Sequence, residues 1–268
     1  MPLTGVAGWP VGHSRSPALH RAAFLNLGLE GWESQLLPIV PELFEETVRA
    51  LPAEGFVGIN VTIPHKREAL RIADTASAQA EAIGAANTLT FRDGQILAAN
   101  TDAPAIEAAI RDRFGLDLPT SALILGAGGS ARAAAFAVRE LGIENPQFIS
   151  RTRSRAQQLA EQFAGSVVDA PEPADLLINC TPIGLTSGGS EQLTELGLGE
   201  EALADFGLVC DLVYRDGGTD LTNGASKAGC KTVGGLEILA RQGALSVEIW
   251  TQLKPDLEVL QAAVAAVS

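Results

Sequence analysis

The sequence predicts an α/β protein made of two domains, and three observations support this fold class. With 268 residues, the chain is longer than the commonest single domain. Short apolar runs alternate with segments of helical periodicity, which is the pattern of a largely parallel sheet covered by helices on both faces. A glycine-rich turn at residues 126–131 lies between an apolar run and an alanine-rich helical segment, as at the start of a dinucleotide-binding unit.

The first set of elements ends near Asp102. Apolar runs predict strands at residues 3–7, 35–40, 56–63, 87–91 and 95–98. Helical periodicity predicts helices at residues 18–27, 42–51, 66–74 and 76–83. Gly28, Gly55 and Pro64 bound three of these segments, because glycine and proline interrupt regular structure. We therefore expect residues 1–102 to form a domain with a mixed, mainly parallel sheet.

The second set of elements begins at Ser121. Strands are predicted at residues 122–125, 147–149, 175–179 and 207–213, and helices at residues 130–141 and 155–163. Residues 186–198, with several glycines and serines, are expected to be a loop, and residues 236–268 are helical with a break at Pro255. We assign residues 103–235 to the second domain, with the boundary between Asp102 and Thr120. The helices of residues 236–268 are expected to pack back on the first domain, since a chain that crosses between two domains commonly returns.

Charge and composition exclude several classes of partner. The net charge is −13, and binding to nucleic acid or to an anionic membrane needs a basic surface, so we expect neither. No run approaches the roughly 18 apolar residues of a membrane span, and the N-terminal residues do not resemble a signal peptide. Cys180, Cys210 and Cys230 are too widely spaced for a CxxC motif and suit a reducing compartment, so we expect a cytoplasmic protein.

The histidines do not predict a metal site. His13, His20 and His65 have no acidic partner at a recognisable metal-ligand spacing. We interpret all three as structural or surface residues, and we expect no metal.

The turn at residues 126–131 has the Gly-x-Gly-x-x-Ala spacing of dinucleotide-binding folds. Gly126 allows the tight turn, Gly128 lets a pyrophosphate approach the backbone, and Ala131 lets helix and strand pack closely. The free N–H groups at the start of the helix would meet the phosphates. A glycine-rich turn without a ligand is the alternative, but the position between a strand and a helix favours a cofactor site.

Three arginines, Arg151, Arg153 and Arg155, lie in the eight-residue string FISRTRSR of this otherwise acidic chain. They follow the second strand of the predicted unit, where an acidic residue would accept a hydrogen bond from the ribose 2′-hydroxyl of NAD. A guanidinium group cannot accept a hydrogen bond, but it binds a phosphate through two parallel ones. The cofactor is therefore predicted to be NADP, the alternative being a solvated basic turn.

Two hydroxyl groups precede the first predicted helix. Ser14 and Ser16 are two positions apart, so in an extended backbone their side chains point the same way. Pro17 suits the first position of a helix, which would make Ser16 its N-cap. A helix start with two hydroxyl groups is also a good site for a carboxylate.

Other polar residues lie where elements of the first domain end. Asn60 and Thr62 share one face of a predicted strand, and Lys66 follows that strand at the sheet edge where α/β proteins bind ligands. On spacing alone, Lys66 could equally be an exposed lysine at a helix start. The same holds for residues that look individually like ordinary turn residues: Asn87, Asn100, Thr101 and Asp102.

Taken together, these strings resemble the shikimate dehydrogenases over essentially the whole chain. The matching strings occur in the family order: GHSRSPALH, GINVTIPHK, GAANTL, NTD, LGAGGSAR, SRTRSRA, NCTPIG, DLVY and GGLEILARQ. The resemblance implies a substrate-binding domain at residues 1–102, an NADP-binding Rossmann domain at residues 103–235, and an active site in the cleft between them. It implies an NADP-dependent interconversion of 3-dehydroshikimate and shikimate in the chorismate pathway of aromatic amino acid biosynthesis.

The resemblance also implies the site residues. The catalytic pair would be Lys66 and Asp102. Substrate contacts would fall on Ser14, Ser16, Thr62, Asn87, Thr101, Asp102, Tyr214 and Gln242. Cofactor contacts would fall on Gly126, Ala127, Gly128, Gly129, Ser130, Ala131, Arg151, Thr152 and Arg155, with Thr181, Leu212 and Gly235 near the nicotinamide.

The proposed chemistry assigns a role to each polar group. In the reduction direction a lysine ammonium can stabilise and then protonate the forming oxyanion, and in the oxidation direction a neutral lysine acts as the base. We expect Asp102 to orient the reacting hydroxyl, Lys66 to exchange its proton, and Ser14 and Ser16 to hold the substrate carboxylate.

Three positions depart from the family pattern, and they keep alternatives open. Ala103 and Pro104 follow the NTD string in place of glycine, Ser150 replaces an asparagine, and Ile238 replaces a methionine. A quinate or shikimate dehydrogenase with relaxed substrate or NAD use is one alternative, and a non-catalytic NADP-binding regulator is another. The protein is expected to be a monomer or a homodimer.

Overall fold

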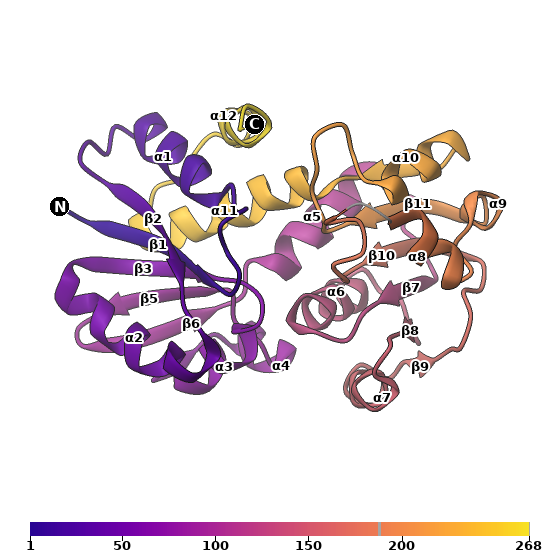
Figure 1. Cartoon of the computed structure of the whole chain (residues 1–268), viewed down its shortest axis with the longest axis horizontal. Coiled ribbons are helices and arrows are strands. Elements are labelled where there is room, and N and C mark those ends of the chain that lie inside the picture. The colour runs from indigo at the N-terminus through magenta and orange to yellow at the C-terminus, as the bar shows by residue number, and fades with distance from the viewer. Residues whose placement is uncertain (187–188, 268) are drawn as a thin grey trace. The chain divides into compact units, whose positions relative to one another are not determined.

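The computed structural model describes residues 1–186 and 189–267, which form two compact units (Figure 1). The first unit comprises Met1–Asp102 and Leu239–Ser268, and the second comprises Ala103–Ile238. Both units are α/β, as the alternation of apolar runs and helical segments predicts. Within the described part of the chain, no helix is both long enough and apolar enough to cross a membrane.

A mixed sheet forms the centre of the first unit. Its strands, in spatial order, are β2 (Glu33–Pro38), β1 (Leu3–Gly8), β3 (Phe56–Val61), β5 (Thr88–Arg92), β6 (Gln95–Ala99) and β4 (Thr75–Ala76). β1 pairs in parallel with both β2 and β3, whereas β5 pairs antiparallel with β3 and β6. The predicted mixed sheet is confirmed, and its parallel part brings the carboxyl ends of β1 and β3 together.

Helices cover both faces of this sheet. They are α1 (Ser16–Asn26), α2 (Phe44–Ala50), α3 (Lys66–Ile72), α4 (Ala78–Ile83), the part of α11 (Gly235–Thr251) in this unit, and α12 (Leu257–Ala265), with 3-10 turns at Pro41–Leu43 and Leu51–Glu54. Phe44 of α2 and Ile72 of α3 are buried in one core with Ile59 of β3. On β3, a Cβ atom at Gly58 would lie 2.3 Å from Nε1 of Trp250, so this glycine lets α11 approach the sheet closely.

The second unit contains a fully parallel sheet. Its strands, in spatial order, are β12 (Lys231–Val233), β11 (Phe206–Asp211), β10 (Ala174–Asn179), β7 (Ala122–Leu125), β8 (Gln147–Ile149) and β9 (Ser166–Val167). Numbered within the unit, this order is 6-5-4-1-2-3, the order of a Rossmann fold, which the sequence predicts. The strand order reverses between β7 and β10, where such folds bind their ligands.

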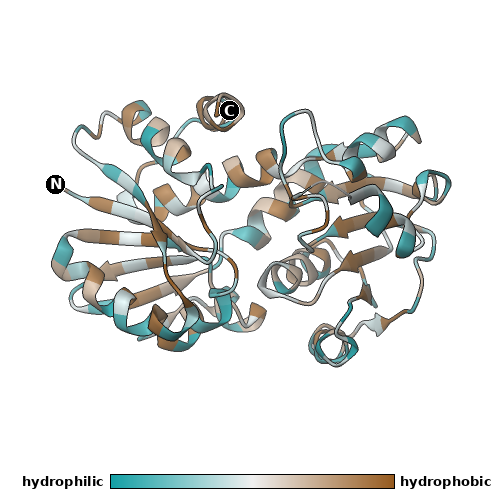
Figure 2. Ribbon diagram, in the orientation of Figure 1, coloured by the Kyte–Doolittle hydropathy of each residue, from teal (hydrophilic) through white to brown (hydrophobic). Residues whose placement is uncertain are grey.

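The helices of the second unit are α5 (Asp102–Phe114), α6 (Gly129–Glu140), α7 (Arg153–Gln162), α8 (Gly189–Glu195), α9 (Glu200–Leu203) and α10 (Asp220–Lys227). Leu123, Phe148 and Leu177 are fully buried in the sheet. Figure 2 shows mostly hydrophobic central strands in both units, and helices along which hydrophilic and hydrophobic residues alternate. Near-continuous apolar strands are expected for a parallel sheet that is covered on both faces.

Two local predictions are wrong. Residues 189–195 form helix α8 and not a loop, because Leu193 is buried in the core and this packing outweighs the glycines and serines around it; residues 187 and 188 lie outside the described part. Ser16 is the first residue of α1 and not its N-cap, which is Arg15. Ser14 performs the capping, since its Oγ accepts the Ser16 N–H at 3.3 Å.

Candidate active site

A small polar cavity of about 90 Å³ lies in the first unit, beside the carboxyl-terminal parts of β1 and β3. Its lining residues come from both strands, from the starts of α1, α3 and α5, from α11, and from the segments before α1, after β3 and before β5: Val6, Ser14, Ser16, Asn60, Val61, Thr62, Lys66, Asn87, Asp102 and Gln242. Most of the side chains that the sequence assigns to the substrate thus line one cavity. Asn60 lines it as well, although the sequence assigns no role to this residue beyond facing the same way as Thr62.

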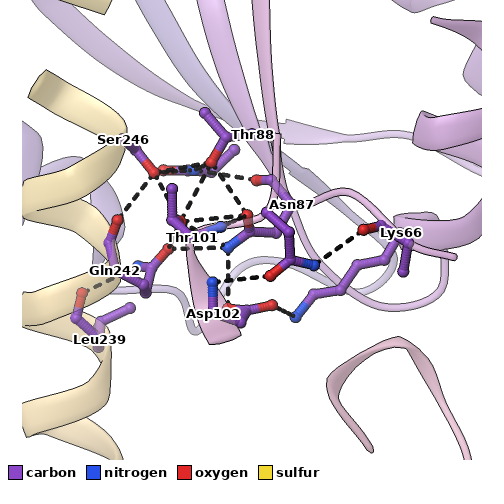
Figure 3. Close-up of polar contacts among 11 residues, drawn as sticks. Lys66, Asn87, Thr88, Thr101, Asp102, Leu239, Gln242 and Ser246 are labelled. Carbon is purple, nitrogen blue, oxygen red and sulfur yellow. Dashed lines mark hydrogen bonds and ion pairs between the residues drawn. The ribbon is translucent and has the colours of Figure 1, made fainter. Parts of the chain in front are cut away.

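Lys66 and Asp102 form an ion pair in this cavity. Nζ of Lys66 lies 2.7 Å from Oδ2 of Asp102, and the two side chains are only 11% and 12% exposed. Lys66 is the first residue of α3, and Asp102 is the first residue of α5, so two element starts meet here (Figure 3). A nearly buried pair of this kind keeps a proton donor and an acceptor at a fixed separation.

Asn87 holds the other oxygen of the Asp102 carboxylate. Its Oδ1 accepts the backbone N–H of Thr101 at 2.7 Å, which fixes the orientation of the amide. Its Nδ2 therefore points at Asp102 and donates to Oδ1 at 2.9 Å. Both carboxylate oxygens are thus engaged by named partners, and Asp102 is held in one orientation.

Two residues of α11 join this hydrogen-bond network. Ser246 Oγ lies 3.2 Å from Thr101 Oγ1 and 2.9 Å from Thr88 Oγ1, and Gln242 lies one helical turn earlier with its Oε1 3.4 Å from Asn87 Nδ2 (Figure 3). Thr101, which the sequence assigns to the substrate, is not among the residues that line the cavity. Ser246 is absent from the sequence-based assignment, because its partners Asn60, Thr88 and Thr101 are all distant from it in the chain.

Ser14 and Ser16 both line the cavity, although the backbone at Arg15 between them is helical and not extended as their spacing argument assumes. Ser14 Oγ donates to Ser16 Oγ at 3.2 Å. Ser16 is almost completely buried, and its hydroxyl oxygen is the acceptor in this bond, so its hydrogen can still be donated to a ligand. The pair therefore presents two adjacent hydroxyl groups to the cavity.

His20 and His65 have partners within the protein. His65 Nε2 lies 2.7 Å from the carbonyl oxygen of Ile39, and its ring stacks on Phe44. His20 is fully buried and bonded to Ser34 and Asn60. Among residues 1–186 and 189–267, no cluster of three or more His, Cys, Asp or Glu side chains could hold a metal ion.

In the second unit, the glycine-rich turn joins β7 to α6. Gly126 has φ of +108°, and a Cβ atom there would lie 3.1 Å from the carbonyl oxygen of Cys180, so the turn requires a glycine. At Gly128 the opposite holds, since a Cβ atom would meet nothing within 4 Å. The space beside the start of α6 is therefore open, as a cradle for a pyrophosphate group must be.

The arginine string follows β8, at the position that its spacing predicts. Arg153 forms an ion pair with Asp169, whereas Arg151 and Arg155 are exposed and form no ion pair with the described residues. Two exposed guanidinium groups thus follow β8, whose last residue, Ile149, accepts the backbone N–H of Gly126 in the glycine-rich turn at 2.8 Å. These residues fit an adenosine that carries a 2′-phosphate.

A buried carboxylate supports the adjacent loop. Asp211 at the end of β11 accepts from Asn179 Nδ2 at 2.8 Å, and Asn179 Oδ1 in turn accepts the Thr181 hydroxyl at 2.7 Å. A Cβ atom at Gly126 would meet Cγ2 of Thr181 at 3.4 Å, so the Thr181 loop adjoins the turn. Leu212 and Gly235 also belong to this unit, and so does Tyr214, which the sequence assigns to the substrate.

The class of protein follows from two features. One unit is a Rossmann fold with an open glycine-rich turn, and the other is an α/β unit with a lysine–carboxylate pair. Together they define a two-domain dehydrogenase. The family model for the shikimate dehydrogenase substrate binding domain matches residues 6–89, and the model for the shikimate 5′-dehydrogenase C-terminal domain matches residues 235–265. The chain is 42% identical over 263 residues to the shikimate dehydrogenase (NADP(+)) of Paracoccus denitrificans, covering 96% of this chain and 93% of the relative.

Solved structures agree with the sequence comparison. Shikimate 5-dehydrogenase from Thermus thermophilus, in complex with NADP(H) and shikimate, matches with a TM-score of 0.84 at 36% identity, covering 98% of both chains. Shikimate dehydrogenase from Aquifex aeolicus matches with a TM-score of 0.89 at 30% identity, covering 98% of this chain and 97% of the other. The chain belongs to the shikimate dehydrogenase family.

Proposed function

We propose that this protein is an NADP-dependent shikimate dehydrogenase, which interconverts 3-dehydroshikimate and shikimate in the chorismate pathway. The observation that carries the proposal is the ion pair of Lys66 and Asp102, held at 2.7 Å in a small polar cavity. Relatives and solved structures with this name cover nearly the whole chain, which supports the same substrate and cofactor.

Ser14 and Ser16 would bind the carboxylate of the substrate. Both hydroxyl groups can donate to a carboxylate oxygen once the Ser14 hydroxyl turns from Ser16 to the substrate, and such bonds to a charged acceptor are stronger than neutral ones. With the carboxylate held there, Thr62, Asn60 and Gln242 line the space left for a hydroxylated ring.

Lys66 would exchange the proton of the reacting hydroxyl group. In the oxidation direction, the O–H bond breaks and the proton moves to a neutral Nζ atom. In the reduction direction, the ammonium group stabilises the developing oxyanion and then returns that proton. Asp102 orients the hydroxyl and keeps Nζ in place, and Asn87 fixes Asp102 through the 2.9 Å hydrogen bond.

NADP would supply or accept the hydride when bound to the second unit. The pyrophosphate would lie against the open space at Gly128 and the first turn of α6, while Arg151 and Arg155 would bind the 2′-phosphate. Thr152 lies between these two arginines, and Thr181 lies beside the glycine turn. These residues fit the phosphorylated cofactor better than NAD, because residues 150–155, which directly follow β8, contain no carboxylate.

The test is an oxidation assay with purified protein that crosses shikimate and quinate with NADP and NAD. The proposal predicts the highest kcat/KM for shikimate with NADP, followed as NADPH absorbance. Comparable values with quinate or with NAD would support the relaxed dehydrogenase instead. No turnover with any pair, together with NADPH binding, would support a regulator. The cytoplasmic location and the monomeric or homodimeric state remain predictions.

A further inference from the structure

Helix α1 carries two buried polar side chains with different surroundings. Ser16 lines the cavity, and His20 lies one turn later on the same face of the helix. His20 is 0% exposed and is not a lining residue. Burying an imidazole completely costs free energy unless its nitrogen atoms are hydrogen-bonded, so the partners of His20 matter.

The hydrogen bonds of His20 join three elements of the first unit. Its Nδ1 lies 2.8 Å from Oγ of Ser34 on β2, and its Nε2 lies 2.9 Å from Oδ1 of Asn60 on β3. The ring also meets the indole of Trp250 edge-on, at a centroid separation of 5.2 Å. His20 is thus the polar connection from α1 to the strand that ends at the cavity.

The surrounding groups define the protonation of the ring. Asn60 Nδ2 donates to the carbonyl oxygen of Asn87 at 3.1 Å, and a carbonyl can only accept, so Oδ1 must face His20. Nε2 of His20 is therefore the donor, and Nδ1 accepts from the Ser34 hydroxyl. Burial lowers the pKa of His20 to about 4, so this neutral form is the one present at neutral pH.

Asn60 passes this constraint to the catalytic half of the cavity. Besides the Asn87 carbonyl, its Nδ2 contacts Oγ1 of Thr88 at 3.1 Å and Oγ of Ser246 at 2.8 Å. Asn87 then bonds to Asp102, the partner of Lys66. A continuous set of buried hydrogen bonds therefore runs from α1 to the ion pair.

We infer that His20 is a positioning residue, which fixes α1 against β3 and thereby sets the separation between the hydroxyl groups of Ser14 and Ser16 and the Lys66–Asp102 pair. This inference rests on the proposed function, in which these two groups bind opposite ends of one substrate. Leu19 also packs closely on Gly243 and holds α1 to α11, but apolar attraction is non-directional and does not fix the position of a polar atom. The hydrogen bond from Nε2 is directional and does fix it.

The test compares two variants, each of which keeps a polar atom near the position of one of the two imidazole nitrogen atoms. In His20→Gln, the amide nitrogen reaches as far as Nε2 and can still donate to Asn60. In His20→Asn, the amide ends near the position of Nδ1, and the bond to Asn60 is lost. We expect His20→Asn to raise the KM for shikimate about 10-fold, as for the loss of one buried hydrogen bond, with a smaller fall in kcat. His20→Gln should recover most of this loss.

A double variant separates positioning from a general structural role. If His20 acts by placing the serines, the KM increases of His20→Asn and Ser16→Ala should be less than multiplicative when combined. Full multiplication, or a wild-type KM in a folded His20→Asn protein, would overturn the inference. If His20→Asn does not fold, Ser34→Ala is used in its place, and we expect it to raise the KM for shikimate about threefold. An unchanged KM in Ser34→Ala would also overturn the inference. Failure of the wild-type protein to oxidise shikimate would instead refute the proposed function.

Discussion

Nδ2 of Asn87 lies 2.9 Å from Oδ1 of Asp102, the carboxylate oxygen that Lys66 does not contact. This leaves Asp102 with one orientation and places Nζ of Lys66 on a fixed side of it. In the proposed mechanism, Lys66 exchanges the proton and Asp102 orients the hydroxyl group. Substitution of each set of residues should affect different kinetic parameters.

Replacing Lys66 by methionine should mainly lower kcat. The side chain keeps its length and loses the group that exchanges the proton, and general acid–base catalysis contributes typically about 10²- to 10⁴-fold. We expect a fall in kcat of that order for shikimate oxidation, with KM within a few-fold of the wild-type value. Lys254→Met, at an exposed lysine of the same unit, is the matched control. Near-normal turnover of the Lys66 variant would remove this residue from the mechanism.

Replacing Ser14 or Ser16 by alanine should mainly raise KM. A hydrogen bond to a charged group contributes about 1.5–3 kcal/mol, which corresponds to roughly 10- to 100-fold in binding. The bond is present in both the ground state and the transition state, so kcat should change less. Steady-state kinetics with shikimate measure the effect, and shikimate methyl ester is the control substrate. If the variants lose as much with the ester as with the acid, the serines do not bind the carboxylate.

Replacing Arg151 by alanine should weaken the binding of NADP and leave that of NAD unchanged. Its exposed guanidinium forms no ion pair with the described residues, whereas Arg153, two positions away, is paired with Asp169. Loss of charge-assisted bonds to a phosphate should raise the Kd of NADPH about 10-fold or more, measured by fluorescence titration. Arg153→Ala is the matched control, with a smaller expected change. Equal losses for NADPH and NADH would contradict a 2′-phosphate site at Arg151.

Much of this fold is visible in the sequence, because buried parallel strands are continuous apolar runs. Strand β8 at Gln147–Ile149 has the predicted bounds, and α11 and α12 are separated at Pro255 as expected. Helix α8 is missed because its stability depends on Leu193 reaching a core formed by distant strands. Helix α5 is missed too, although Ala103, Ile106 and Ile110 have helical spacing and are buried, because residues 103–120 are interpreted as the connection between the two domains.

The polar network shows the same division. Strand ends and short spacings point to Ser14, Ser16 and Lys66, whose neighbours in the chain indicate an edge of the sheet. His20 and Ser246 have no such local signal, because they become significant only through Asn60, at separations of 40 and 186 positions. Partners this distant along the chain are set by tertiary packing.

Asp211 provides a test of stability against pH. Its carboxylate accepts from Thr219 Oγ1 at 2.6 Å, from Asn179 Nδ2 at 2.8 Å and from the N–H of Val213 at 3.0 Å. Burial outweighs these bonds and raises the pKa of Asp211 from 3.8 to about 6. The folded protein therefore binds this proton more tightly than the unfolded chain does. The contribution of Asp211 to the free energy of unfolding is greatest below pH 3.8 and falls as the pH rises to about 6.

Asp211→Asn should remove this pH dependence. The asparagine has no proton to lose, so its free energy of unfolding, relative to the wild type, should be higher at pH 7.5 than at pH 4 by roughly 2–3 kcal/mol. Any constant effect of the amide on packing cancels in this difference.

His20 acts in the opposite direction. Its pKa is lowered from 6.5 to about 4, so its contribution to the free energy of unfolding is lost as the pH falls from 6.5 to about 4. The variant should therefore lose stability on acidification more steeply than the wild type. Urea unfolding at several pH values measures both curves, and parallel curves would show that Asp211 is not held ionised at a cost to folding.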